Sequence, residues 1–153
     1  MTKIAEKNKK ALQIIVELLR NTEPLIKTKL VKLLFLIDMK FLEIYGKKMS
    51  ELTYVRYFYG PYSRDIDYLL TFLNAKGVIS YEEHINSDGK TYYLIELSNN
   101  EKYNEVSKSL GEKERKIIKE IADRYSKKDL SKILEEVYNI PKVKNKNFGE
   151  EII

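Results

Sequence analysis

Residues 26–46 read IKTKLVKLLFLIDMKFLEIYG, and this stretch is the most apolar helical pattern in the chain. At 100° per residue, Lys29, Lys32 and Lys40 fall on one narrow stripe, and apolar side chains cover nearly all of the remaining helix surface. Gly46 follows the last periodic residue and supplies the left-handed conformation that commonly ends a helix. The pattern therefore predicts a helix at the centre of the hydrophobic core.

Asp38 lies on the side of this helix opposite the lysine stripe, which predicts a buried carboxylate. A buried carboxylate on a central helix usually anchors a neighbouring segment through hydrogen bonds. Candidate partners are Arg56, Arg64, a hydroxyl of Tyr57 or Tyr59, and backbone N–H groups. We expect Asp38 to be structural rather than catalytic.

The segments on either side of the central helix have other spacings of apolar residues, which predict their secondary structure. Apolar residues at helical spacing over residues 5–20 predict one amphipathic helix before it. After it, residues 52–59 (LTYVRYFY) predict a short strand ended by Gly60 and Pro61. Ser63 is then the expected N-cap of a third helix, which Gly77 ends.

Alternating residues over 78–97 predict an antiparallel hairpin that turns at Asp88 and Gly89. Helical patterns follow within residues 100–138, at 100–109, 112–126 and 128–138, before a polar tail over residues 139–153. The sequence thus predicts one mainly helical α+β domain over residues 1–153. Its helices and single hairpin follow a winged-helix-like order.

Composition removes most catalytic chemistries. The chain has 153 residues with no Cys and only one His, His84, so it lacks the residues for cysteine nucleophiles, thiolate metal sites and multi-His metal sites. No P-loop, dinucleotide-binding or serine-hydrolase motif occurs. Asp65 and Asp67 are two residues apart in a predicted helix, so their side chains point to different faces and do not form a pair of catalytic carboxylates. We therefore expect no enzymatic activity, no cofactor and no metal.

No apolar run is long enough to span a membrane, and the first residues lack the apolar core of a signal peptide. We expect a cytoplasmic protein without membrane contact.

Charge is unevenly placed along the chain. The net charge is +6 over residues 1–48, −3 over residues 49–98 and +2 over the remainder. Because nucleic-acid binding depends on neutralising phosphates, only the first third has suitable electrostatics. Lys27, Lys29 and Lys32 are the candidate nucleic-acid contacts, whereas the acidic middle favours a basic protein partner.

Eight of the twelve tyrosines lie between residues 54 and 93. Tyrosine supplies a large contact area and a polar tip, and protein interfaces are enriched in it. We expect a partner-binding face formed by the 54–64 segment and the hairpin. Its candidate residues are Tyr54, Tyr57, Tyr59, Tyr62, Tyr81 and Tyr92.

Three short motifs occur in order: KLVKLLFLID at 29–38, YGKKMS at 45–50 and YGPYS at 59–63. Together, within motif region 29–63, they resemble the Panacea family, also called SocA-like antitoxins. The structural motif residues that carry the resemblance are Asp38, Gly46, Gly60, Pro61 and Ser63.

The resemblance implies a non-enzymatic antitoxin that neutralises a protein toxin encoded nearby or delivers it to a protease. The alternative is a winged-helix DNA-binding transcriptional regulator, favoured by the element order and the basic first third. The two activities can coexist, since antitoxins often repress their own operons. The sequence leaves the toxin and the oligomeric state open.

Overall fold

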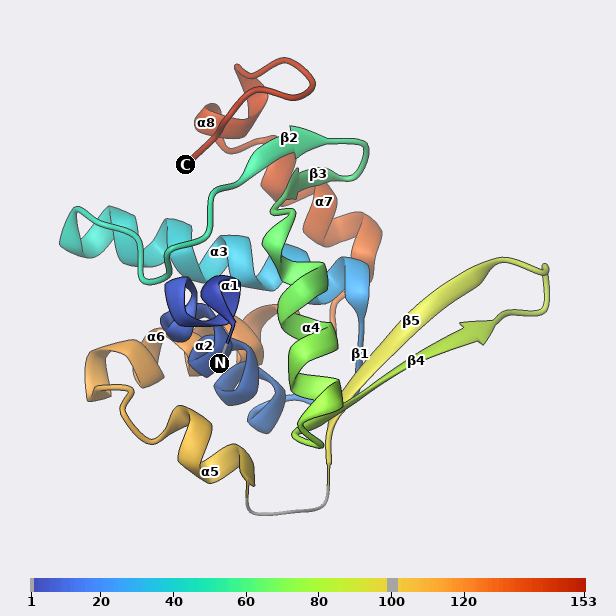
Figure 1. Ribbon diagram of the computed structural model, residues 1–153. Coiled ribbons are helices and arrows are strands. Elements are labelled where there is room, and N and C mark those ends of the chain that lie inside the picture. Colours follow the sequence, from blue (N-terminus) through green and yellow to red (C-terminus); the bar gives the residue numbers. More distant parts are fainter. Residues whose placement is uncertain (1, 99–101) are drawn as a thin grey trace.

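The computed structural model describes residues 2–98 and 102–153, and its central element is the helix α3 (Lys27–Tyr45). This helix contacts α6 (Glu112–Tyr125), α7 (Leu130–Tyr138) and strands of both small sheets (Figure 1). Gly46 ends α3 with a φ of 78°, and its N–H donates to the Leu42 carbonyl at 2.9 Å. The central position and the glycine stop are as the sequence predicts.

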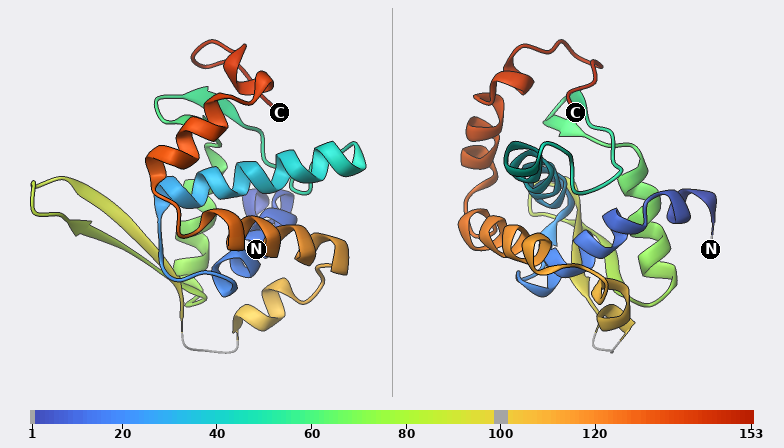
Figure 2. Two further views of the ribbon diagram at one scale, coloured as in Figure 1. Left: turned by 180° about the vertical axis from the view of Figure 1, so that it is seen from behind. Right: turned by 90° about the vertical axis from the view of Figure 1, so that its left-hand side faces the viewer.

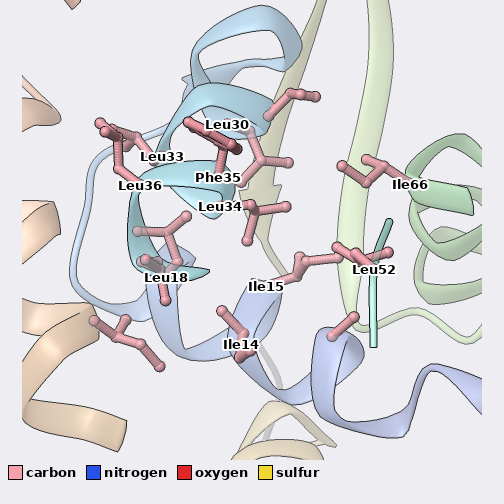
Figure 3. Close-up of a cluster of buried hydrophobic side chains, with 14 of the residues drawn as sticks. Ile14, Ile15, Leu18, Leu30, Leu33, Leu34, Phe35, Leu36, Leu52 and Ile66 are labelled. Atoms are coloured by element: carbon pink, nitrogen blue, oxygen red, sulfur yellow. The ribbon is translucent and has the colours of Figure 1, made fainter. Parts of the chain in front are cut away.

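Two helices, rather than one, precede α3. They are α1 (Lys3–Lys7) and α2 (Lys9–Arg20), and the non-helical Asn8 separates them. Asn8 is buried, and its side-chain amide donates to the Ile4 carbonyl at 2.9 Å. The predicted single helix over residues 5–20 is therefore wrong at this junction. Figure 3 shows Ile15 and Leu18 of α2 packed towards the apolar face of α3.

The larger sheet is antiparallel, with the order β1-β5-β4. Its strands are β1 (Leu25–Ile26), β4 (Ile79–Ile85) and β5 (Thr91–Leu97), and Ile79 pairs with Leu97 as the alternation predicts. The turn contains Gly89 with a φ of 77°. Strand β1 was not predicted, because two residues are too short for an alternating pattern. Beyond its base, the β4–β5 hairpin projects from the helical body as an arm (Figures 1 and 2).

A second hairpin takes the place of the predicted strand over residues 52–59. It consists of β2 (Val55–Tyr57) and β3 (Gly60–Tyr62), so Gly60 and Pro61 start a strand instead of ending one. Gly60 has a φ of 88°, which a residue with a side chain rarely adopts. Over residues 2–98 and 102–153 there are therefore two hairpins where one was expected.

The next helix, α4 (Asp65–Ala75), begins one residue later than Ser63 predicts. Arg64 occupies the N-cap position, and no side chain makes a capping hydrogen bond. Ser63 is buried, and its carbonyl accepts a hydrogen bond from the Ile66 N–H at 3.2 Å.

The C-terminal helices are α5 (Lys102–Ser107), α6 and α7, and positions 100 and 101 of the predicted helix lie outside the described residues. The predicted polar tail over 139–153 is wrong. This C-terminal segment contains the helix α8 (Pro141–Lys144), buries Val143 and Ile152, and returns to the β2–β3 hairpin. There the Ile152 N–H donates to the Tyr54 carbonyl at 2.7 Å. The fold class, a mainly helical α+β domain, is as expected.

Asp38 is buried, with 1% of its surface exposed, and a backbone N–H binds it, which is one of the predicted alternatives; the side chain that binds it is not one of the predicted ones. Ser50 donates its N–H to Oδ1 at 2.7 Å and its Oγ hydroxyl to Oδ2 at 2.5 Å. Burial raises the pKa of Asp38, and the hydrogen bonds from Ser50 oppose that rise. Arg56 instead donates to the carbonyls of Val143 and Lys146. Asp38 therefore fixes the chain just after α3, and Arg56 fixes the C-terminal segment.

Candidate partner-binding site

A pocket of about 320 Å³ lies between the two hairpins, with the start of α3 at its base. Three segments of the chain contribute to it, and several of the predicted tyrosines meet there. The lining residues are Ile26, Lys27, Thr28, Val31 and Lys32 from β1 and α3, Tyr57, Tyr59, Gly60 and Tyr62 from the β2–β3 hairpin, and Thr91, Tyr92 and Tyr93 from β5. We refer to it as the Lys32 pocket.

Lys32 is the most deeply placed charged group of this pocket, with 2% of its surface exposed. Its Nζ donates to the Pro61 carbonyl oxygen at 2.9 Å. No carboxylate in the described part of the chain forms an ion pair with it. Burial lowers the pKa of Lys32 to about 8, so the ammonium form still predominates at pH 7.

Lys27, the second lysine of the pocket, is already neutralised. It forms an ion pair with Asp67 of α4, which also accepts a hydrogen bond from the Tyr62 hydroxyl. Burial lowers the pKa of Lys27, but the hydrogen bond and charge of Asp67 outweigh it, and the net shift is upward. The Lys27 Nζ also lies 6.0 Å from the Tyr62 ring centre and 5.7 Å from that of Tyr93. Lys27 therefore links the two hairpins by cation–π contacts.

Beside the pocket opening, four aromatic side chains form what we refer to as the aromatic surface. Tyr57, Phe58, Tyr59 and Phe148 are exposed by 44%, 69%, 66% and 58%. The Tyr57 ring centre lies 5.4 Å from that of Phe148 and 4.9 Å from that of Phe58, so three of the rings are in contact. Aromatic side chains gathered and exposed in this way commonly mark an interaction site.

The β2–β3 hairpin, which carries Tyr57, Phe58 and Tyr59, is held in place by α7 and the C-terminal segment. The Arg56 guanidinium stacks 5.1 Å from the Tyr138 ring centre, and the Tyr138 hydroxyl donates to the Phe58 carbonyl at 3.3 Å. The Arg56 N–H also donates to the Glu150 carbonyl at 2.9 Å. Because α7 and the C-terminal segment brace the hairpin, the aromatic surface is presented on a supported element.

The structure places the predicted tyrosines in three different environments. Tyr57, Tyr59, Tyr62 and Tyr92 line the Lys32 pocket. Tyr54 is fully buried and packs edge-on against Phe35, at 5.3 Å between ring centres, so it offers no surface to a partner. Tyr81 is half-buried against the core, and its ring lies 5.2 Å from that of Tyr93.

Sequence reasoning missed several residues of the site. Tyr93 shares a strand face with Ile95, so strand alternation could have indicated it. Phe58 lies in the tyrosine-rich segment itself, and the aromatic character that it shares with its neighbours could have indicated it. Phe148 lies on the C-terminal segment, which folds back onto the β2–β3 hairpin. No sequence motif in that segment predicts that it folds back.

The three lysines proposed to contact nucleic acid do not form an exposed row. Lys27 is paired with Asp67, Lys32 is buried, and the Lys29 Nζ donates to the Ser126 carbonyl at 3.0 Å. Lys27 is therefore neutralised and Lys32 is covered, whereas Lys29 keeps its charge and uses one of its N–H groups inside the molecule.

A second, larger groove of about 1150 Å³ runs between α3, α6 and the start of α8. Its apolar floor includes Leu36, Met39 and Ile121, and its rim carries charges of both signs. In residues 2–98 and 102–153 no group of three metal-ligating side chains occurs, and no described helix is both long and apolar enough to cross a membrane.

Comparison with known proteins gives one result. The model of the antitoxin SocA-like, Panacea domain family matches residues 30–141, which include most of α3, both hairpins and the helices from α4 through α7. Neither the search of curated proteins nor that of solved structures gave a match. Since the match covers well over half of the chain, the protein belongs to the SocA-like antitoxin family and carries its Panacea domain.

Proposed function

We propose that this chain is a non-enzymatic antitoxin-like protein that binds and neutralises a protein toxin through the aromatic surface and the Lys32 pocket. Membership of the SocA-like family supports a toxin as the class of partner. The observation that carries the choice of surface is the contact cluster of exposed rings at Tyr57, Phe58 and Phe148. Exposed aromatic groups are costly in water and are the commonest anchors of protein interfaces.

The experiment uses the product of the neighbouring open reading frame as the toxin. Phe58→Ala and Phe148→Ala are co-expressed with it, and growth rescue and the dissociation constant are measured. An anchor worth about 2 kcal/mol raises the dissociation constant by roughly 30-fold. We expect each variant to show such a loss and to rescue growth poorly.

Tyr45→Ala is the matched control, because Tyr45 is also an exposed aromatic residue, with 40% of its surface accessible. It ends α3, whereas the last pocket residue on that helix is Lys32, thirteen residues earlier and roughly 20 Å away along the helix axis. The control should bind like the wild type. Unchanged rescue by both phenylalanine variants, with unchanged melting temperatures, would place the toxin interface elsewhere.

DNA binding remains the second candidate, and the projecting β4–β5 arm, which follows helices α1 to α4 in the described chain, is the feature that favours it. The charges oppose it. Asp65 and Asp67 lie in the first turn of α4, and Glu82 and Glu83 lie on the arm. A gel-shift assay with the upstream region of the operon distinguishes the two, since binding that falls steeply with salt would support a DNA-binding role.

Delivery of the toxin to a protease is a further expectation from family membership. It would require a separate surface for the protease while the toxin is bound. A degradation assay of the toxin with and without this protein tests that role.

A further inference from the structure

The buried position of Lys32 is unfavourable for a charged side chain. Burying an ammonium group costs free energy unless charge and hydrogen bonds compensate, and a methionine of similar length would fill the same space without that cost. Within the described residues the compensation consists of one carbonyl oxygen, that of Pro61, for a group with three N–H donors. The ammonium group therefore retains capacity to bind an acceptor.

The pocket around Lys32 has a net charge that selects the ligand. Its other cation, Lys27, is balanced by Asp67, so one positive charge remains. The remaining side chains of the lining are uncharged, and five of them are tyrosines. A pocket with one uncompensated positive charge is suited to a group with a single negative charge.

The size of the pocket limits the ligand further. At about 30 Å³ per water molecule, 320 Å³ corresponds to roughly ten waters, which is enough for one or two side chains and too little for a helix. Nucleic acid is disfavoured as well, since phosphate recognition uses several cations along an open groove. A carboxylate at the end of a short side chain fits both the charge and the volume.

We propose that the Lys32 pocket binds an aspartate or glutamate side chain of the protein partner, inserted between the two hairpins while the aromatic surface covers the residues around it. This rests on the proposed function and specifies the chemistry of the partner at one point. The acidic residues Glu82 and Glu83 lie on the arm and do not line the pocket. The preference for a basic partner expected from the middle of the sequence therefore does not apply inside the pocket.

The test needs no toxin. The probe is N-acetyl-glutamate N-methylamide, whose only charge is its side-chain carboxylate, and its glutamine counterpart is the neutral control. The full chain is labelled with ¹³C-lysine, and the Lys32 Cε signal is followed by NMR during titration. We expect a saturable shift with a dissociation constant on the order of 1 mM, and binding at least tenfold weaker for the glutamine probe.

Two variants complete the experiment. Lys32→Met assigns the signal and should abolish the saturable response elsewhere in the pocket. Lys29→Met is its match, because Lys29 lies on the same helix but outside the pocket lining, and it should respond like the wild type. A second readout is the pH titration of the Lys32 signal, whose pKa should rise when the acidic probe is bound. The titratable groups around it are Lys27, the Lys27-bound Asp67, the five pocket tyrosines and, from α7, Tyr138, which lies beside Gly60 as Lys32 does.

The proposal is overturned if the Lys32 signal does not move, or if the glutamate and glutamine probes move it equally. Such a result leaves the aromatic surface untouched, because growth rescue by the phenylalanine variants tests that surface separately. Conversely, acid binding in the pocket together with full rescue by those variants would refute the proposed toxin surface while keeping the carboxylate site.

Discussion

Replacing Asp38 by alanine should destabilise the protein strongly, and the structure allows the size of the effect to be worked out. The change removes the acceptor of two buried donors, the Ser50 N–H and the Ser50 hydroxyl. Each unpaired buried donor costs about 1–3 kcal/mol, and breaking a buried charged network commonly costs about 3–5 kcal/mol. We expect the free energy of unfolding to fall by about 3–5 kcal/mol.

The assay is urea denaturation of the full chain followed by circular dichroism. With a slope of about 2 kcal/mol per molar urea, the midpoint should fall by roughly 2 M. Asp123→Ala is the control, because Asp123 is a 61% exposed carboxylate in a surface ion pair with Lys119 and should change stability by less than about 1 kcal/mol. If Asp38→Ala unfolds within about 1 kcal/mol of the wild type, the anchoring role of Asp38 is refuted.

A pH series with Asp38→Asn separates the charge from the shape. Burial raises the pKa of Asp38 above its ordinary value of 3.8, so the unfolded chain loses the proton first. The associated stability is present below pH 3.8 and is lost as the pH rises through the folded-state pKa. The wild type should therefore lose stability relative to Asp38→Asn over that rise. A relative gain would show that burial is not the dominant effect.

Three further predictions concern the site and its supports. Gly60→Ala should lower the free energy of unfolding by about 1–2 kcal/mol in urea denaturation, because a φ of 88° strains any residue with a Cβ. Steric crowding adds little, since the atom nearest to the new Cβ, Lys32 Cε at 3.5 Å, is at an ordinary contact distance. Arg56→Ala should speed amide hydrogen exchange at Gly149 and Ile152, since the guanidinium holds the segment that leads to them, and unchanged exchange would contradict that role. Between pH 8 and pH 10 the free energy of unfolding of the wild type should rise, because burial lowers the pKa of Lys32 from 10.5 to about 8 and the unfolded chain binds more protons in this range. Lys32→Met should lack this rise. Ionisation of the tyrosines interferes only above their ordinary pKa of 10.0.

Long periodic patterns predicted the elements they cover. The buried apolar faces of α3, the glycine stop at Gly46 and the register of the β4–β5 hairpin all follow from side-chain spacing within one element. Asp38 was predicted to be buried for the same reason. Its partner Ser50 was missed because the choice among polar groups depends on the path of the loop after α3, which spacing does not encode.

The site was only partly predictable, because it is assembled from segments that are distant in the sequence. Tyrosine density indicated a region in which several tyrosines do line one pocket, but it did not distinguish the buried Tyr54 from the pocket residue Tyr59. Lys32 is a predicted candidate for contact with nucleic acid, and in the structure it is covered by the β2–β3 hairpin and α7. Such covering is a tertiary effect that helical periodicity cannot show.

The arm formed by β4 and β5 has a consequence for self-association. Strand β1 pairs only with Ile95 and Leu94, and β4 lies at the edge of the order β1-β5-β4, so among the described strands the arm keeps two largely open edges. Open edges invite strands of other chains to add and extend the sheet from molecule to molecule. Glu82 and Glu83 stand exposed on β4, and two arms brought edge to edge would set these charges against each other. The negative charge of this segment thus also helps to keep the arm from becoming a template for aggregation.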